Sequence, residues 1–325
     1  MTTRLPRTIP WMTIAFAAAL FIPILGTRFY TSVATDVLIL GLFATSLNLL
    51  LGTTGLVSFG HAAYFAIGAY VCAIAMKTFE APFLLALPLA GLAAGAAALV
   101  FGYFCVRLTK IYFAMLTLAF AQIVWAICFK WNDVTGGEQG FNNVPYPDLA
   151  WMEAIPGLSS MRIGELYFYV TLAVVCLCLY VLRRITNSPF GRILTTIREN
   201  PERAEFVGID VRRFELAAFV IAGLFAGLAG ALFGIFNRGV FPDFGYWAKS
   251  AEVLIMVILG GMGQFFGPLV GAFTLVVLNQ QITSYTEYWP LVLGLLLIVL
   301  LYAFPAGLLG TIADLVKTLR GRRDA

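Results

Sequence analysis

Charged side chains are scarce in this chain, and their scarcity is the first guide to its class. Of 325 residues, 12% are charged and 61% are hydrophobic, and the mean hydropathy is +0.90. Because a soluble domain carries roughly a quarter charged residues, this composition excludes an ordinary soluble protein. It predicts an all-α integral membrane protein with a single membrane domain over 1–325. The net charge of +4 gives no support to nucleic-acid binding.

The motifs that many enzymes and nucleotide-binding proteins need are also missing. The sequence contains no GxxxxGK[ST] phosphate loop, no HExxH and no GxSxG, and His61 is its one histidine. We therefore expect no enzymatic activity, no ATP site and no other cofactor in this chain. The cysteines form no CxxC pair, so we interpret them as small apolar side chains rather than as a metal site. They are Cys72, Cys105, Cys128, Cys176 and Cys178.

Long apolar runs dominate what is present. A helix needs roughly 20 apolar residues to cross the hydrocarbon core, so about ten crossings fit this chain. The first run follows Arg4 and Arg7, as in a secretory signal, but no small-x-small cleavage site precedes Thr27. We therefore interpret it as the first membrane helix. The predicted spans are 11–27, 33–51, 60–76, 82–106, 111–130, 164–182, 214–236, 249–263, 266–285 and 289–309.

The basic residues give these spans an orientation. Lys and Arg accumulate in the cytoplasmic connections of membrane proteins. Most of the 21 Lys and Arg lie near the N-terminus, at 107–110, in the segment 183–213 and in the C-terminal tail. Ten crossings from a cytoplasmic N-terminus place all of these on one side, and the more acidic loop over 130–165 falls on the other. We therefore expect both termini and the segment 183–213 in the cytoplasm.

The polar segment 183–213 carries the signature of two short helices. Ser188 and Pro189 suit the N-cap and the first helical position. A second start follows at Asn200-Pro201-Glu202, and Gly208 is the expected stop. Apolar residues at spacings of three and four predict that the first helix is amphipathic. These residues are Phe190, Ile193, Leu194 and Ile197.

The charges of this segment have two interpretations. Glu199 and Arg203 stand four residues apart, as do Arg198 and Glu202, which is typical of a solvated helix face. The apolar stripe of the first helix would, however, hold the segment against the membrane domain and present its charges to a cytoplasmic partner. We favour a docking surface over a bland loop.

Glycines predict close helix packing and two interruptions. Small residues four apart let helix backbones approach closely in lipid, and such pairs occur at Gly91/Gly95, Gly223/Gly227, Gly230/Gly234 and Gly267/Gly271. Glycine-rich breaks lie at 52–60 and at 260–268. Paired breaks point to a transport pathway built from an internal repeat. Ordinary tight turns between helices explain them equally well.

Neutral polar residues inside the apolar runs are candidates for lining such a pathway. In hydrocarbon these groups need partners or water, so each is as well explained by hydrogen bonding between helices. For His61 we favour a satisfied structural histidine over a path-lining one. The candidate pathway residues are Asn48, Ser58, His61, Tyr64, Gln122 and Asn279.

Four blocks of the sequence resemble the LivM-type permeases of branched-chain amino-acid ABC importers. They are GLVSFGHAAYFAIGAY at 55–70, YFAMLTLAFAQ at 112–122 with TGG at 135–137, SPFGR at 188–192 through IREN at 197–200 and GI at 208–209, and LGGMG at 259–263 with GP at 267–268. The resemblance implies a fold of about ten helices in the type II importer arrangement. It also implies that 183–213 is the coupling segment, which would contact an ATP-hydrolysing subunit through Arg198, Glu199, Asn200, Glu202 and Arg203.

The resemblance further implies partners and a location. These are a LivH-type second permease subunit, two ATP-binding subunits that hold ATP and Mg, a periplasmic binding protein, and membrane lipid in the bacterial inner membrane. The expected cargo is branched-chain or other hydrophobic amino acids, with urea, short amides or aromatic acids as alternatives within similar permeases. From a different class, a single-component channel or facilitator for a small neutral solute fits the same polar lining. A purely structural subunit would instead predict that changing Asn48, Gln122 or Asn279 leaves transport by the assembled complex untouched.

Overall fold

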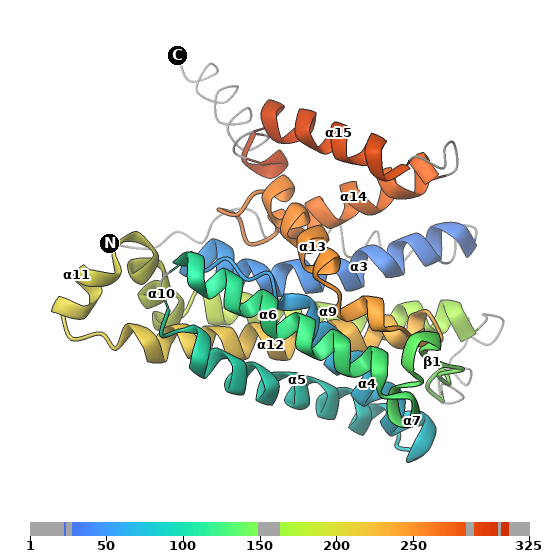
Figure 1. Ribbon diagram of the computed structural model, residues 1–325. Helices are drawn as coiled ribbons and strands as arrows, with labels where there is room; N and C mark the ends of the chain where they lie inside the picture. Colours follow the sequence, from blue (N-terminus) through green and yellow to red (C-terminus); the bar gives the residue numbers. More distant parts are fainter. Residues whose placement is uncertain are drawn as a thin grey trace.

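The computed structural model describes residues 23, 28–108, 110–148, 163–283, 289–304 and 307–311, and this part of the chain is almost entirely helical (Figure 1). Apart from Pro23, the helix expected over 11–27 lies outside these residues, as does the tail after Thr311. Helices within the described ranges match the other nine predicted runs. They are α3 (Arg28–Asn48), α4 (His61–Thr78), α5 (Phe83–Cys105), α6 (Lys110–Lys130), α9 (Ile163–Thr186), α12 (Val211–Phe236), α13 (Trp247–Gly260), α14 (Gly267–Thr283) and α15 (Trp289–Ala303).

Helix α3 lies at the centre of the bundle and is longer than the sequence predicts. It packs against α9, α12, α13 and α14 and continues as a π-helical turn, η1 (Leu49–Thr54). The wider turn is held by Thr54, whose hydroxyl donates to the Leu49 carbonyl oxygen at 3.0 Å. The chain then reverses at Gly55, where φ is +81°. The first glycine-rich break therefore begins inside the helix, because residues 52–54 belong to η1 and the chain reverses only at Gly55.

Helices α4, α5 and α12 pack closely through small residues, as the glycine pairs predict. A Cβ atom at Gly230 would overlap the carbonyl oxygen of Phe65, and one at Gly227 would overlap the side chain of Ala94. Likewise, a Cβ atom at Gly223 would lie 2.5 Å from the Cβ of Ala98. In lipid, close van der Waals packing of this kind is a main source of helix association.

Helices α13 and α14 form a tight hairpin around the second glycine-rich break. Their 14 and 17 residues give lengths of about 21 and 26 Å, less than the ~30 Å of the hydrocarbon core. Helix α13 ends at Gly260 because Gly261 adopts a φ of +109°. A Cβ atom at Gly260 would overlap the Gly267 carbonyl oxygen, so the hairpin depends on glycine.

Short elements complete the end of the bundle opposite the polar segment. At the end opposite the polar segment lie α7 (Asn132–Thr135), the 3-10 turns η2 (Gly137–Gln139) and η3 (Pro242–Gly245), and the strands β1 (Phe141–Asn142) and β2 (Gly239–Val240) (Figure 1). The strands pair antiparallel, with Phe141 opposite Val240. Thr135 ends α6 by donating to the carbonyl oxygens of Cys128 and Trp131, each at 2.7 Å.

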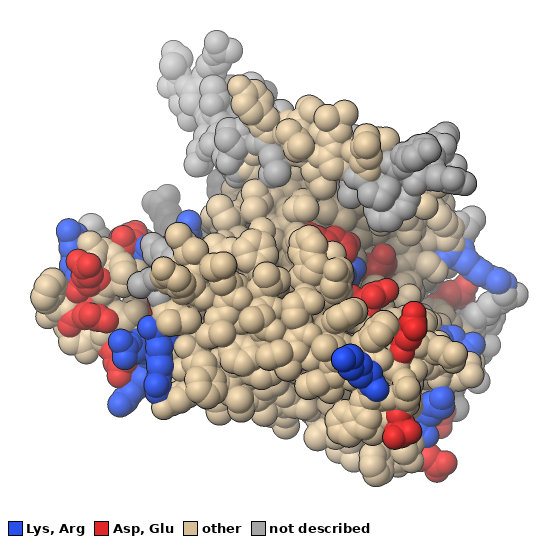
Figure 2. All heavy atoms as spheres, in the orientation of Figure 1, with Lys and Arg blue, Asp and Glu red and all other residues tan. Residues whose placement is uncertain are grey.

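The outer surface has the polarity of a membrane protein. Figure 2 shows charged side chains gathered toward the two ends of the bundle, with a broad uncharged surface between them. Large apolar residues on α5 and α6, such as Leu89 and Ile123, are exposed. Five helices of the described residues are long and apolar enough to cross a membrane. They are Arg28–Thr54, Phe83–Cys105, Ile111–Lys130, Ile163–Thr186 and Val211–Phe236.

Candidate functional site: the polar segment and the two glycine breaks

The polar segment 183–213 folds into the two helices that its sequence predicts. Helix α10 (Pro189–Glu199) begins after Ser188, whose hydroxyl accepts from the Gly191 amide at 3.4 Å. Helix α11 (Pro201–Phe206) begins after Asn200, whose side chain accepts from the Arg203 amide at 2.9 Å. Gly208 has a φ of +85°, so it ends the second helix as expected. Asn200 therefore fixes the corner between the two helices.

The apolar stripe of α10 holds the segment against the membrane domain. Leu194 and Ile197 are fully or almost fully buried, and Ile197 packs with Ala204 of α11 and Val211 of α12. The rings of Phe190 and Phe214 stack with centroids 5.7 Å apart. Both helices are thereby fixed to the start of α12, and the segment is a built surface rather than a loose loop.

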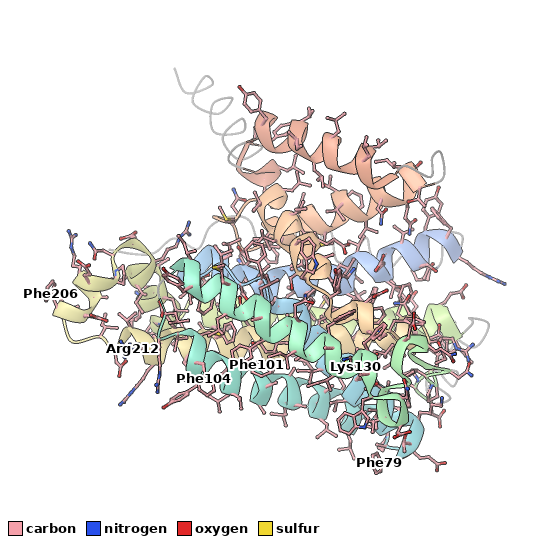
Figure 3. The ribbon with its side chains drawn as sticks, in the orientation of Figure 1. Phe79, Phe101, Phe104, Lys130, Phe206 and Arg212 are labelled. Atoms are coloured by element: carbon pink, nitrogen blue, oxygen red, sulfur yellow. The ribbon has the colours of Figure 1, made fainter. Side chains whose placement is uncertain are left out.

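The tip of the segment is apolar and unprotected. Phe206 is 89% exposed and Val207 is 71% exposed. Figure 3 shows Phe206 at the free tip of α11, where its ring points away from the bundle. The charged residues Glu202, Arg203 and Glu205 precede it on the same short helix and are also exposed. Sequence reasoning attended to the charges and missed these two residues, although two bulky apolar residues just before a helix-ending glycine were a visible signal.

The five residues expected at a partner interface separate into two groups. Glu199, Glu202 and Arg203 are exposed on the segment, and Asn200 is the half-buried cap between its helices. Arg198 is also exposed, but its guanidinium turns inward and Nη1 donates a hydrogen bond to the carbonyl oxygen of Gly52. The polar segment is thus joined directly to the end of η1.

The two glycine-rich breaks meet beside this contact. A Cβ atom at Gly52 would lie 2.5 Å from the Met262 carbonyl oxygen. The side-chain amide nitrogen of Asn48 lies 3.5 Å from the backbone carbonyl oxygen of Gln264. A cavity of about 180 Å³ opens between them. It is bordered by Thr195 and Arg198 of α10, by Asn48 and Gly52, and by Met262 and Gln264 of the second break. Asn48 Oδ1 is buried without a hydrogen-bond partner among the described residues.

His61 occupies a packed position in the core. It is fully buried, its ring stacks on Phe43 at 5.3 Å, and Nε2 lies 2.8 Å from the Ser46 hydroxyl oxygen. Because that hydroxyl donates to the Phe43 carbonyl oxygen at 2.7 Å, we assign the proton of the shared contact to Nε2 of a neutral His61. This packing favours the structural interpretation, but the ring is satisfied on one side only, because Nδ1 is buried without a partner among the described residues.

The other candidate pathway residues lie in different surroundings. Tyr64 is buried edge-on against Phe219, with centroids 5.5 Å apart, and lies next to His61. Ser58 is fully buried, while Gln122 is half-buried on α6. Asn279 lies on α14, where its side chain accepts from Thr283 at 3.2 Å. Of the six candidates, Asn48 alone borders the cavity described above.

Replacing His61 by alanine tests the structural interpretation. We expect a stability loss of about 3 kcal/mol, because the change removes a packed ring and a buried hydrogen bond. A fall in Tm of the detergent-purified protein would show it. Ser58→Ala is the control and should leave Tm nearly unchanged, because its hydroxyl has no partner among the described residues. An unchanged Tm with altered solute selection would instead make His61 a lining residue.

Comparison with known proteins places this architecture in a family. The model for "Branched-chain amino acid transport system / permease component" matches residues 29–301. The permease protein LivM of the high-affinity branched-chain amino acid transport system of Escherichia coli K12 is 34% identical over 316 residues, which cover 92% of this chain and 74% of that protein. LivH of the same organism is 26% identical over 83% of this chain and 90% of its own length.

A more partial similarity reaches another permease. The fructose import permease protein FrcC of Rhizobium meliloti is 32% identical over 153 residues, or 43% of this chain and 41% of that protein. No solved structure matches. The family model covers most of the chain, and the glycine-rich breaks and the polar segment lie within the matched range. The chain belongs to the family of permease components of branched-chain amino acid transport systems.

Proposed function

We propose that this chain is a permease subunit of an ABC importer, through which branched-chain or related hydrophobic amino acids enter the cell at the expense of ATP hydrolysed by partner subunits. Similarity to LivM and LivH, which are permease proteins of a branched-chain amino acid transport system, supports the cargo. The observation that carries the coupling is the α10–α11 segment, which is fixed to the membrane domain and exposes an apolar tip. A chain with no phosphate loop needs such a surface to receive work from another subunit.

The proposed membrane arrangement has ten crossings, in the manner of type II importers, with both termini in the cytoplasm of a bacterial cell. The order of the described helices supports it, since the polar segment and the strands lie at opposite ends of the bundle (Figure 1). The basic residues of the polar segment favour the cytoplasm for that end.

The proposed assembly contains a LivH-type second permease, two ATP-binding subunits that hold ATP and Mg, and a periplasmic binding protein. Similarity to both LivM and LivH supports a pair of related but different permeases. Exposed apolar residues on α15, such as Leu291 and Ile298, offer surface either for a second permease or for lipid.

The contact with an ATP-binding subunit is proposed at the tip of α11. A large aromatic side chain ringed by polar residues is the usual composition of an interface hot spot. Phe206 supplies the aromatic group, and the exposed Glu202, Arg203 and Glu205 of the same helix are the candidates for the polar residues beside it. Glu199 extends the charged surface along α10. The charges would orient the partner, while burial of Phe206 would supply most of the affinity.

Phe206→Asp tests this proposal. We expect copurification with the ATP-binding subunits to fall by about 30-fold or more, which corresponds to a hot-spot loss of at least about 2 kcal/mol. The matched control is Phe79→Asp at the opposite end of the bundle, where the ring is 75% exposed (Figure 3). Both variants should reach the membrane at wild-type levels. Undiminished copurification of the Phe206 variant would contradict docking at this tip.

Reconstitution separates the importer from a single-component channel. The purified chain alone in liposomes should take up no leucine, whereas the complete complex with ATP and the binding protein should. Uptake by the isolated chain without ATP would overturn the importer assignment in favour of the channel.

A further inference from the structure

Arg198 makes a hydrogen bond within the chain, which docking of a partner would not require. Its guanidinium reaches the Gly52 carbonyl oxygen, 146 positions away in sequence. Its aliphatic stem crosses Gly55, since a Cβ atom there would lie 2.9 Å from Arg198 Cγ. The side chain is therefore aligned against the turn that ends η1. Arg198 is exposed as a whole, but it follows the buried Ile197 and lies one turn after the buried Leu194, so its side chain can reach η1.

The Gly52 carbonyl group, which accepts this hydrogen bond, needs a partner from outside its own helix. The last carbonyl groups of a helix have no intrahelical donor, and they carry partial negative charge. In η1 the chain turns away at Gly55, and the Leu56 amide donates back to the Leu50 carbonyl oxygen at 3.0 Å. Arg198 thus caps the end of the α3–η1 helix from another element, with a full positive charge.

The same turn touches the second glycine-rich break on its other side. Gly52 has no room for a side chain because the Met262 carbonyl oxygen lies against it. One turn earlier, Asn48 approaches the Gln264 carbonyl oxygen. A separate contact joins α9 to this break, with the Arg183 guanidinium 5.2 Å from the centre of the Phe266 ring. The end of η1 therefore lies between the polar segment and the loop that joins α13 to α14.

From this arrangement we propose that Arg198 is a positioning residue that passes movement of α10 and α11 to the end of α3 and, through Gly52 and Asn48, to the loop between α13 and α14. This role rests on the proposed importer function, and it assigns the inward contact of Arg198, rather than its exposed position, the larger part in transport. Displacement of α10 by a partner would pull or release the Gly52 carbonyl group. Because Gly52 and Met262 are in contact, the second break would have to move with it.

The proposal separates assembly from transport. Arg198→Met keeps the packed stem and removes the guanidinium, so docking through Phe206 stays intact while the link to η1 is lost. In the reconstituted complex we expect copurification with the ATP-binding subunits and ATP hydrolysis within about twofold of wild type, and leucine uptake reduced about tenfold or more. Arg198→Lys retains a donor and a charge, and should recover part of the uptake. Arg192→Gln, on the exposed side of α10, is the matched control and should transport normally.

Each result has one meaning. Wild-type uptake by Arg198→Met would overturn the proposal, and so would parallel loss of copurification and uptake, because that pattern marks a docking residue. If Arg198→Met fails to accumulate, Arg198→Lys is judged by the same two criteria. Failure of the wild-type chain to copurify with ATP-binding subunits, or uptake without ATP, would instead contradict the importer function itself.

Discussion

Gly230→Ala is expected to lower the stability of the membrane domain by about 3 kcal/mol or more, as severe overpacking does, although it adds only one methyl group. The new Cβ atom would overlap the Phe65 carbonyl oxygen, which belongs to the backbone of α4 and cannot rotate away. Helices α4 and α12 would have to separate along their contact. Since α12 also packs on α3 and α5, the shift would spread through the bundle. Tm in detergent and the amount of protein in membranes would measure it.

Gly95→Ala is the matched control for this prediction. Gly95 lies in α5, which also packs on α12, but its added Cβ atom would stand 3.5 Å from Leu224, an ordinary contact. Replacing a helical glycine by alanine gains up to about 1 kcal/mol in helix propensity where space allows. We therefore expect Gly95→Ala to be neutral or slightly stabilising. Equal Tm values for the two variants would show that close backbone approach does not hold α4 to α12.

The sequence predicts the helices well because membrane segments are long and uniformly apolar. Local signals also predict both short helices of the polar segment, since Ser188 and Asn200 act through amides only three residues away. What escaped prediction depends on distant partners. The extension of α3 through Thr54 is capped by Arg198, and the start of α4 is capped by Ser250, whose hydroxyl accepts from the Ala62 amide at 2.9 Å. The β1–β2 pair joins two strands of only two residues each.

The sequence predicts which segments form the candidate site, but it does not predict the contacts between them. Glycine spacing indicated two breaks, but no local pattern states that Gly52 and Met262 touch. Counting charges placed Arg198 with Glu199 on one surface, and both are exposed, but the hydrogen bond from Arg198 to Gly52 had no local signal. Polar residues inside apolar runs suggested one pathway lining, whereas the structure uses His61 and Tyr64 in the packed core and places Asn48 at the cavity. Whether substrate passes these residues stays a prediction.

The contact between the two glycine-rich breaks leads to the second prediction with a large effect, a loss of uptake when Gly52 is replaced. Gly52→Ala would place a Cβ atom 2.5 Å from the Met262 carbonyl oxygen and would also crowd Asn48. Asn48 can rotate, but the backbone at Met262 cannot, so the breaks must move apart. Because the tip of α11 is untouched, we expect the complex to assemble at wild-type levels while uptake falls about tenfold or more, a loss of at least about 1.4 kcal/mol in the transport step.

Gly263→Ala, in the facing loop, decides whether this loss comes from the contact or from glycine itself. Gly263 borders the same cavity, yet a Cβ atom there meets nothing within 4 Å. If flexible glycines are what transport needs, both variants should lose uptake to a similar extent. If the close approach of the two breaks is what matters, Gly263→Ala should transport like the wild type and Gly52→Ala should not. Normal uptake by both variants would show that the breaks move apart without consequence, and the link from Arg198 to Met262 would then lose its last step.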